Sequence, residues 1–171
     1  VQCSASCPGR ESAATAFISC QSIMPSTLKY SSQPIDHLPL CGAREAPALL
    51  LRDRQLNYAE LERLTGRLAA HLVNHGRSPG DRVASWLGKG LLAAVLPLAV
   101  ARAGLVHVPI NPVLKRAQVA HILVDSGASL LITNSARAGS LARGDVPGAC
   151  HIIDDAALLA AIEGQGNAMP P

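Results

Sequence analysis

The residues that could do chemistry in this sequence are a few histidines, one lysine between glycines and a pair of aspartates. His71 and His75 stand four positions apart, a spacing at which two imidazoles on one helix face can share a metal ion. No carboxylate or third ligand is evident near them in the sequence. We therefore interpret the two histidines as part of a solvated helix face, and we expect no metal site.

The segment Gly88-Lys89-Gly90 is the second candidate, because an anion can bind where such a loop meets the start of a helix. The two common phosphate loops, G-x-G-x-x-G and G-x-x-x-x-G-K-[ST], do not occur in the sequence. A single lysine between two glycines is typical of an ordinary strand-to-helix turn. We expect such a turn here.

His107 alternates with valines on an expected strand, so it is either a hydrogen-bonded core histidine or a residue that points into a cleft; we favour the core. Asp154 and Asp155 are adjacent, and adjacent helical residues do not face one another, so we expect capping. We assign the remaining polar candidates to helix surfaces, a strand and a helix end: His121, Lys115–Arg116, His151 and Ser126-Gly127. No nucleophile, base and oxyanion set can be assembled, so the sequence predicts no catalytic or cofactor-binding residue in this chain.

The composition fits one domain with a real core. The chain has 171 residues, 49% of them hydrophobic, which argues against disorder throughout. The net charge of +3 is spread along the chain and aromatic residues are scarce, so we expect no nucleic-acid partner. The longest apolar run, Leu91 to Ala101, is too short to span a bilayer. The five cysteines show no paired spacing, and we expect free thiols and a cytoplasmic protein.

The elements that must position these residues begin with a strand, turn and strand over "PALLLRDRQLNY". Asn57 then stands three residues before Glu60, the spacing of a capping box with Asn in place of Ser or Thr. An apolar stripe follows at helical spacing: Leu61, Leu64, Leu68 and Leu72. We therefore expect an amphipathic helix that ends at Gly76.

Strands and helices alternate from that point. We expect strands at 82–87, 105–110, 129–133 and 149–153, and helices at 91–103, 113–126 and 135–143, with a last short helix after Asp154 or Asp155. Pro97 predicts a kink in the second of the long helices, or a late start. This alternation predicts an α/β fold with a mostly parallel sheet and helices on both faces.

Residues 1–34 are rich in Ser, Ala, Cys and Pro without periodicity, and we expect a poorly ordered leader. The first residue is Val, which favours a fragment boundary at this point, and Met24 is a candidate natural start. Residues 35–171 are expected to form the folded part.

The stretch from Ala48 to Thr133 resembles the start of the AMP-forming adenylating enzymes, which include acyl-CoA synthetases, peptide-synthetase adenylation domains and luciferases. "LNYAEL", "GRLAAHL" and "GDRV" match the opening helix and strand of that family. "AGLVHVPINP", "LVDSGA" and "LLIT" match its following strand ends and helix. Within the family, "NPVLKRAQVAHIL" is similar to acyl-CoA ligases of exosortase and exopolysaccharide gene clusters.

The resemblance implies ATP-dependent activation of a carboxylate, such as a fatty acid, as an acyl adenylate, followed by transfer to a thiol such as coenzyme A. It also implies Mg²⁺, a phosphate loop ending in P-K-G and a lysine from a mobile C-terminal domain. None of these elements occurs in this sequence, so we expect an incomplete N-terminal portion of the large domain, truncated before the phosphate loop and inactive by itself. The alternative is a free-standing Rossmann-like binding module without catalysis.

Overall fold

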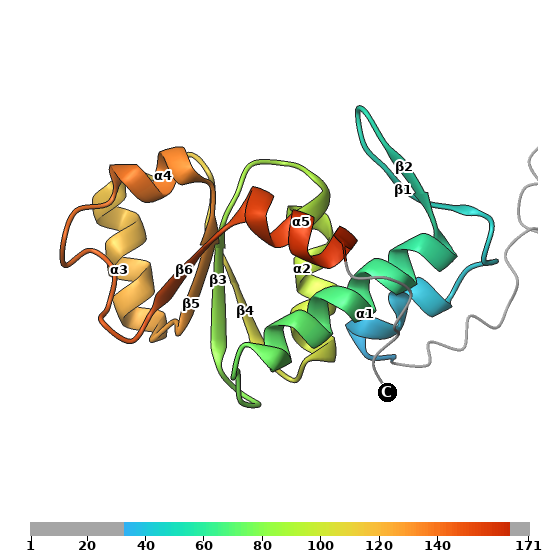
Figure 1. Cartoon of the computed structure of the whole chain (residues 1–171), viewed down its shortest axis with the longest axis horizontal. Coiled ribbons are helices and arrows are strands. Elements are labelled where there is room, and N and C mark those ends of the chain that lie inside the picture. Colours follow the sequence, from blue (N-terminus) through green and yellow to red (C-terminus); the bar gives the residue numbers. More distant parts are fainter. Residues whose placement is uncertain (1–32, 165–171) are drawn as a thin grey trace, which may run out of the picture. The chain divides into compact units, whose positions relative to one another are not determined.

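The computed structural model of the chain describes residues 33–164 (Figure 1). The expected leader therefore lies outside the described residues, apart from Gln33 and Pro34. The described part begins with a short 3-10 helix, η1 (Ile35–Leu40), which the sequence patterns did not predict.

A two-stranded antiparallel hairpin follows, as the sequence predicts. It consists of β1 (Pro47–Leu50) and β2 (Gln55–Asn57), and the amide of Leu51 donates to the carbonyl of Arg54 at 2.8 Å to close its turn. The hairpin leads directly into α1 (Tyr58–Asn74).

The capping box of α1 is confirmed with Asn as the capping residue. Oδ1 of Asn57 accepts from the Glu60 amide at 2.8 Å, and Oε2 of Glu60 accepts from the Asn57 amide at 2.9 Å. The four leucines of the predicted stripe are all buried. The capping-box spacing therefore predicts the start of this helix, and the leucine periodicity predicts its inner face.

The main sheet has four parallel strands in the order β4-β3-β5-β6. Their bounds are β3 (Arg82–Trp86), β4 (Val106–Pro109), β5 (Leu130–Thr133) and β6 (His151–Asp154). The helices that connect and follow them are α2 (Leu91–Arg102), α3 (Arg116–Ser126), α4 (Ser135–Ser140) and α5 (Asp155–Gly164). The expected fold class is confirmed.

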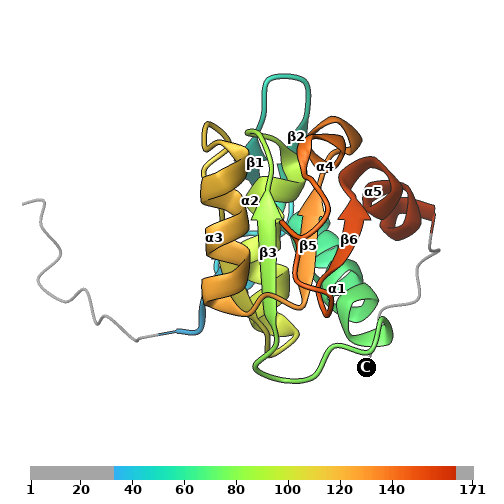
Figure 2. The same cartoon turned by 90° about the vertical axis from the view of Figure 1, so that its left-hand side faces the viewer.

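Helices cover both faces of this sheet. Figure 1 shows α1, α2 and α5 on one side and α3 and α4 on the other, and Figure 2 shows the sheet from the side of α3 and α4. Successive strand residues face opposite sides, so Val83 and Leu130 join the core beneath α1 and α2, whereas Ala84 and Leu131 join the core beneath α3.

One helix start differs from the expectation. α3 begins at Arg116 rather than Val113, because Oδ1 of Asn111 accepts from the Val113 amide at 3.1 Å and holds the chain in a turn. α2 begins at Leu91, as expected, and continues through Pro97, so the alternative of a late start is wrong. Its apolar surface is buried, as predicted for a helix between layers.

Candidate functional site at the carboxyl ends of the strands

The four parallel strands end at one edge of the sheet, because parallel strands all run in the same direction. The residues that follow them carry Lys89 after β3, Asn111 after β4, Asn134 after β5 and Asp155 after β6. In open α/β proteins this carboxyl edge is where ligands bind. This edge is therefore the candidate location of a ligand-binding site.

Most polar side chains at this edge shape the turns in which they lie. Oδ1 of Asp154 accepts from the amides of Ala156 and Ala157 at 3.0 and 3.1 Å, which confirms its predicted capping role. Oδ1 of Asn134 likewise accepts from the Arg137 amide at 2.8 Å. These carboxylate and amide oxygens cap the first turns of α5 and α4.

The larger hollow at this edge lies beside β4, on the face covered by α2. Its volume is about 730 Å³ and it is open to solvent. Apolar side chains from three elements make most of its lining: Leu87, Ala93, Pro97, Pro109, Ile110 and Val113. Lys89 and Asn111 lie at the same hollow from the loops after β3 and β4. A concave, mainly apolar surface of this size is typical of a small-molecule site.

Ser85 and His107 are the polar side chains that the strands contribute to this hollow. Nε2 of His107 and Oγ of Ser85 lie 2.9 Å apart and form a hydrogen bond. Burial lowers the pKa of His107, so its imidazole is neutral at pH 7. His107 is thus hydrogen-bonded, but it is half-buried and lines the hollow, so the favoured core position is wrong and the alternative of a residue at a cleft holds.

A neighbouring hollow of about 540 Å³ shares the Gly88–Gly90 loop with the first and extends toward α4 and α5. Arg137 lines it, and its guanidinium lies 5.4 Å from the centroid of the Trp86 ring, within cation–π range. The same guanidinium reaches the carbonyls of Trp86 and Pro112, each at 3.4 Å. Arg137 therefore links the ends of three strands. The Gly88–Gly90 loop connects β3 to α2 and is the strand-to-helix turn that the sequence predicts.

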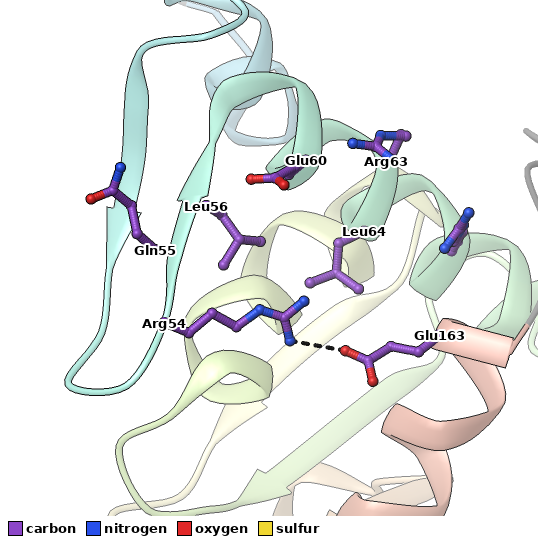
Figure 3. A pocket seen from close by; sticks show the side chains of 8 residues that line it. Arg54, Gln55, Leu56, Glu60, Arg63, Leu64 and Glu163 are labelled. Atoms are coloured by element: carbon purple, nitrogen blue, oxygen red, sulfur yellow. Dashed lines mark hydrogen bonds and ion pairs between the residues drawn. The ribbon is translucent and has the colours of Figure 1, made fainter.

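A third hollow, of about 140 Å³, lies between the hairpin, α1 and α5 (Figure 3). Nη1 of Arg54 pairs with Oε1 of Glu163 at 2.9 Å across it, as the dashed line in Figure 3 shows. Glu60, at the start of α1, also lines the hollow and is held by the capping box. Two arginines of α1 line it as well, Arg63 and Arg67. This hollow joins the hairpin to α5 and has little apolar surface for a ligand.

The interpretation of His71 and His75 as a solvated pair is wrong for His71. The His71 side chain is buried, with 8% of the residue exposed, and its ring centroid lies 4.0 Å from that of His75. Burial, and then the neighbouring His75, lowers the pKa of His71. The signal was present in the sequence, because His71 follows Leu64 by seven residues and Leu68 by three, which places it on the apolar stripe.

The remaining candidates lie where the sequence predicted. His121 is exposed on α3, Arg116 is exposed and pairs with Asp145, and His151 is exposed on β6. Gly127 ends α3 with a φ of 58°, in the left-handed region. Ser126 is part of this helix end, and both carbonyls accept from the Arg82 guanidinium, at 2.9 and 2.8 Å.

The described residues do not gather the ligands of a metal ion. Within residues 33–164 no group of three or more His, Cys, Asp or Glu side chains could hold a metal ion. The same part of the chain contains no helix that is long and apolar enough to cross a membrane.

Comparison with known proteins identifies the family. A family model described as AMP-binding enzyme matches residues 42–170. The chain is 40% identical over 120 residues to phosphinothricin tripeptide synthetase PhsC of Streptomyces viridochromogenes, which covers 70% of this chain and 10% of PhsC. It is 33% identical over 126 residues to isonitrile lipopeptide synthase of Mycobacterium tuberculosis, covering 74% of this chain and 5% of that protein. The chain thus spans a tenth or less of these two relatives.

Solved structures agree with this result. The N-terminal subdomain of Klebsiella oxytoca NpsA, in complex with anthranilyl-AMSN, superposes with a TM-score of 0.61 at 28% identity. That match covers 74% of this chain and 31% of the solved NpsA subdomain chain. The N-terminal domain of FACL13 from M. tuberculosis gives a TM-score of 0.63 at 30% identity, over 69% of this chain and 31% of that domain's chain. The sequence resemblance is confirmed: this chain belongs to the AMP-binding enzyme family of AMP-forming ligases, and its fold is part of the N-terminal region of such an enzyme.

Proposed function

We propose that this chain is the N-terminal portion of an ATP-dependent acyl-CoA ligase, and that by itself it does not form an acyl adenylate. The observation that carries the proposal is the family match over residues 42–170, which coincides with a parallel sheet that lacks a phosphate loop. In the proposed reaction, a carboxylate oxygen attacks the α-phosphorus of ATP and releases pyrophosphate. A thiol then attacks the acyl carbon and releases AMP.

The contribution of this chain to that reaction is architectural. The loops after β5 and β6, fixed by Asn134 and Asp154, form a rim against which the nucleotide-binding elements of a complete enzyme would pack. The buried residues of α2 and the central strand β3 hold that rim in place. A cytoplasmic location is part of the proposal, supported by the free thiols of Cys41 and Cys150.

Coenzyme A is the acceptor in this proposal, supported by the similarity of the segment Asn111–Leu123 to acyl-CoA ligases. The relatives named above are synthetases, and one related structure is a fused adenylation–PCP di-domain from K. oxytoca. A carrier-bound thiol is therefore the competing acceptor. A transfer assay that offers free coenzyme A and a phosphopantetheinyl carrier protein side by side separates the two.

The central test has two parts. Carboxylate-dependent exchange of labelled pyrophosphate into ATP should remain at the no-protein level with this chain alone, because it lacks groups for phosphate and metal. Coding DNA read beyond the codon for Pro171 should continue in frame into a Y-T-S-G-[ST]-T-G-x-P-K-G motif. Exchange activity in the chain alone contradicts the proposed inactivity, and a stop codon followed by no such motif favours the free-standing module.

A further inference from the structure

The hollow beside β4 differs from the rest of the carboxyl edge in its chemistry. The loops at that edge use their carboxylate and amide groups in turns, and the second hollow carries the Arg137 cation. The β4 hollow instead has an apolar wall from α2 and a strand floor with one polar pair, Ser85 and His107. The floor of this hollow is uncharged at neutral pH, because burial keeps the pKa of His107 low.

The Ser85–His107 pair can serve as either a donor or an acceptor. If the Ser85 hydroxyl donates to Nε2, the proton of the neutral imidazole is on Nδ1, which is then a donor. If Nε2 donates to the Ser85 oxygen, Nδ1 is an acceptor. Among the described residues, Nδ1 of His107 forms no hydrogen bond, so this atom is available to a ligand.

The position of the Ser85–His107 pair favours recognition of a ligand in the hollow. Ser85 is only 6% exposed, so the strand backbone and its neighbours fix the side chain that orients the imidazole. β4 is an edge strand, so the hollow beside it is reached from solvent. Lys89 is exposed at the rim, where water screens its charge.

We infer that the β4 hollow binds an uncharged, mostly apolar small molecule that carries a single hydrogen-bonding group, and that the Ser85–His107 pair recognises this group. The hollow, of about 730 Å³, is larger than a ligand built on a single aromatic ring. Binding replaces water on apolar walls and leaves no charge to be desolvated at the floor. The inference does not depend on adenylation, because it involves neither ATP nor a thiol.

Phenol, toluene and benzoate test this inference as ligands of similar size. The full chain is titrated with each at pH 7.5 while the imidazole resonances of the histidines are followed by NMR. We expect phenol to bind about fivefold more tightly than toluene, because phenol adds one hydrogen bond, and to shift the His107 ring resonances but not those of exposed His121. Benzoate is expected to bind more weakly than phenol.

Two variants with a matched control locate the site. His107→Leu should reduce the preference for phenol over toluene to about one, whereas His121→Leu, the same change at an exposed position on α3, should leave it unchanged. Ala93→Phe fills the hollow from α2 without touching the polar pair and should abolish binding of both ligands. Thermal melting establishes that each variant is folded, and Ala93→Phe decides the location if His107→Leu does not fold. Benzoate binding as tight as phenol binding, or phenol binding that survives Ala93→Phe, overturns the inference.

Discussion

Arg102 at the end of α2 donates two hydrogen bonds to the carboxylate of Glu62 in α1, from Nη1 to Oε1 at 2.8 Å and from Nη2 to Oε2 at 3.0 Å. Nη2 also donates to the carbonyl of Asp36 in η1 at 2.6 Å. Both charged side chains are about one-fifth exposed, so solvent screens the pair only in part. One guanidinium thus fastens three elements to one another on the same face of the sheet.

Arg102→Met is expected to lower the free energy of unfolding by about 1–3 kcal/mol, since hydrogen bonds between charged groups are lost and Glu62 is left without its partner. Arg102→Lys should recover only part of this loss, because an ammonium cannot form the two parallel bonds. Urea denaturation of each variant measures the difference. The matched control is Arg54→Met, which breaks the exposed pair with Glu163 and should cost less than about 1 kcal/mol. Equal losses in Arg102→Met and the control would show that partial burial adds nothing.

Leu68 and Leu96 are fully buried where α1 and α2 pack together. Replacing either with Ala should cost about 2–5 kcal/mol through lost burial and a residual cavity. Leu50, 72% exposed in β1, provides the control, and Leu50→Ala should change stability by no more than about 0.5 kcal/mol. Chemical denaturation midpoints with unchanged slopes are the measurement. A small effect at Leu68 or Leu96 would contradict the packing described here.

Stability should fall as the pH drops below about 6.5, because burial lowers the pKa of His71 in the folded state. Above that pH both states hold a neutral imidazole, whereas below it the unfolded chain binds a proton that the folded chain resists. The contribution of His71 is therefore complete above the unfolded pKa and is lost as the pH falls through 6.5 toward the folded value.

His71→Leu should flatten the loss of unfolding free energy between pH 7.5 and 5.5, measured by urea titration at both values. Some slope should remain, because burial also lowers the pKa of His107. His121→Leu, at an exposed position, serves as the control. A slope unchanged by His71→Leu would mean that its burial does not resist protonation.

Cys41 and Cys150 should react with iodoacetamide at very different rates in a chain whose other three cysteines are replaced by Ser. Cys41 is exposed, whereas Cys150 is 8% exposed and burial raises the pKa of its thiol. Because the thiolate is the reactive form, Cys150 should be alkylated at least about tenfold more slowly at pH 8. Mass spectrometry of timed samples gives both rates, and in urea the two rates should converge. Comparable rates in the folded chain would contradict the buried position of Cys150.

The sequence predicted best those features that depend on residues close together in the chain. The Asn57–Glu60 spacing predicted the start of α1, and leucine periodicity predicted its buried face, because both depend on residues within a few turns. η1 could not be predicted, since "IDHLPL" has no periodicity and this helix packs against α1 and α2, which follow it in the chain.

The candidate site depends on contacts between residues of different strands, which the order of residues in the sequence does not show. Ser85 and His107 meet because β3 and β4 pair in parallel with Val83 opposite His107 and Ser85 opposite Pro109. That register is set by packing between layers, so the sequence supported His107 as a hydrogen-bonded residue without revealing its partner. The sequence pattern predicts a start of α3 that is too early for a related reason, since the Asn111 side chain competes with the helix for the Val113 amide.

The strand order has a consequence for how the chain is made. β3 is synthesised first and lies inside the sheet, β4 and then β5 add to its two sides, and β6 adds outside β5. Each of β4, β5 and β6 therefore leaves the ribosome after the strand with which it must pair. Among the strands of residues 33–164 none has to be inserted between two others, so this sheet can grow outward during translation, one strand and one covering helix at a time.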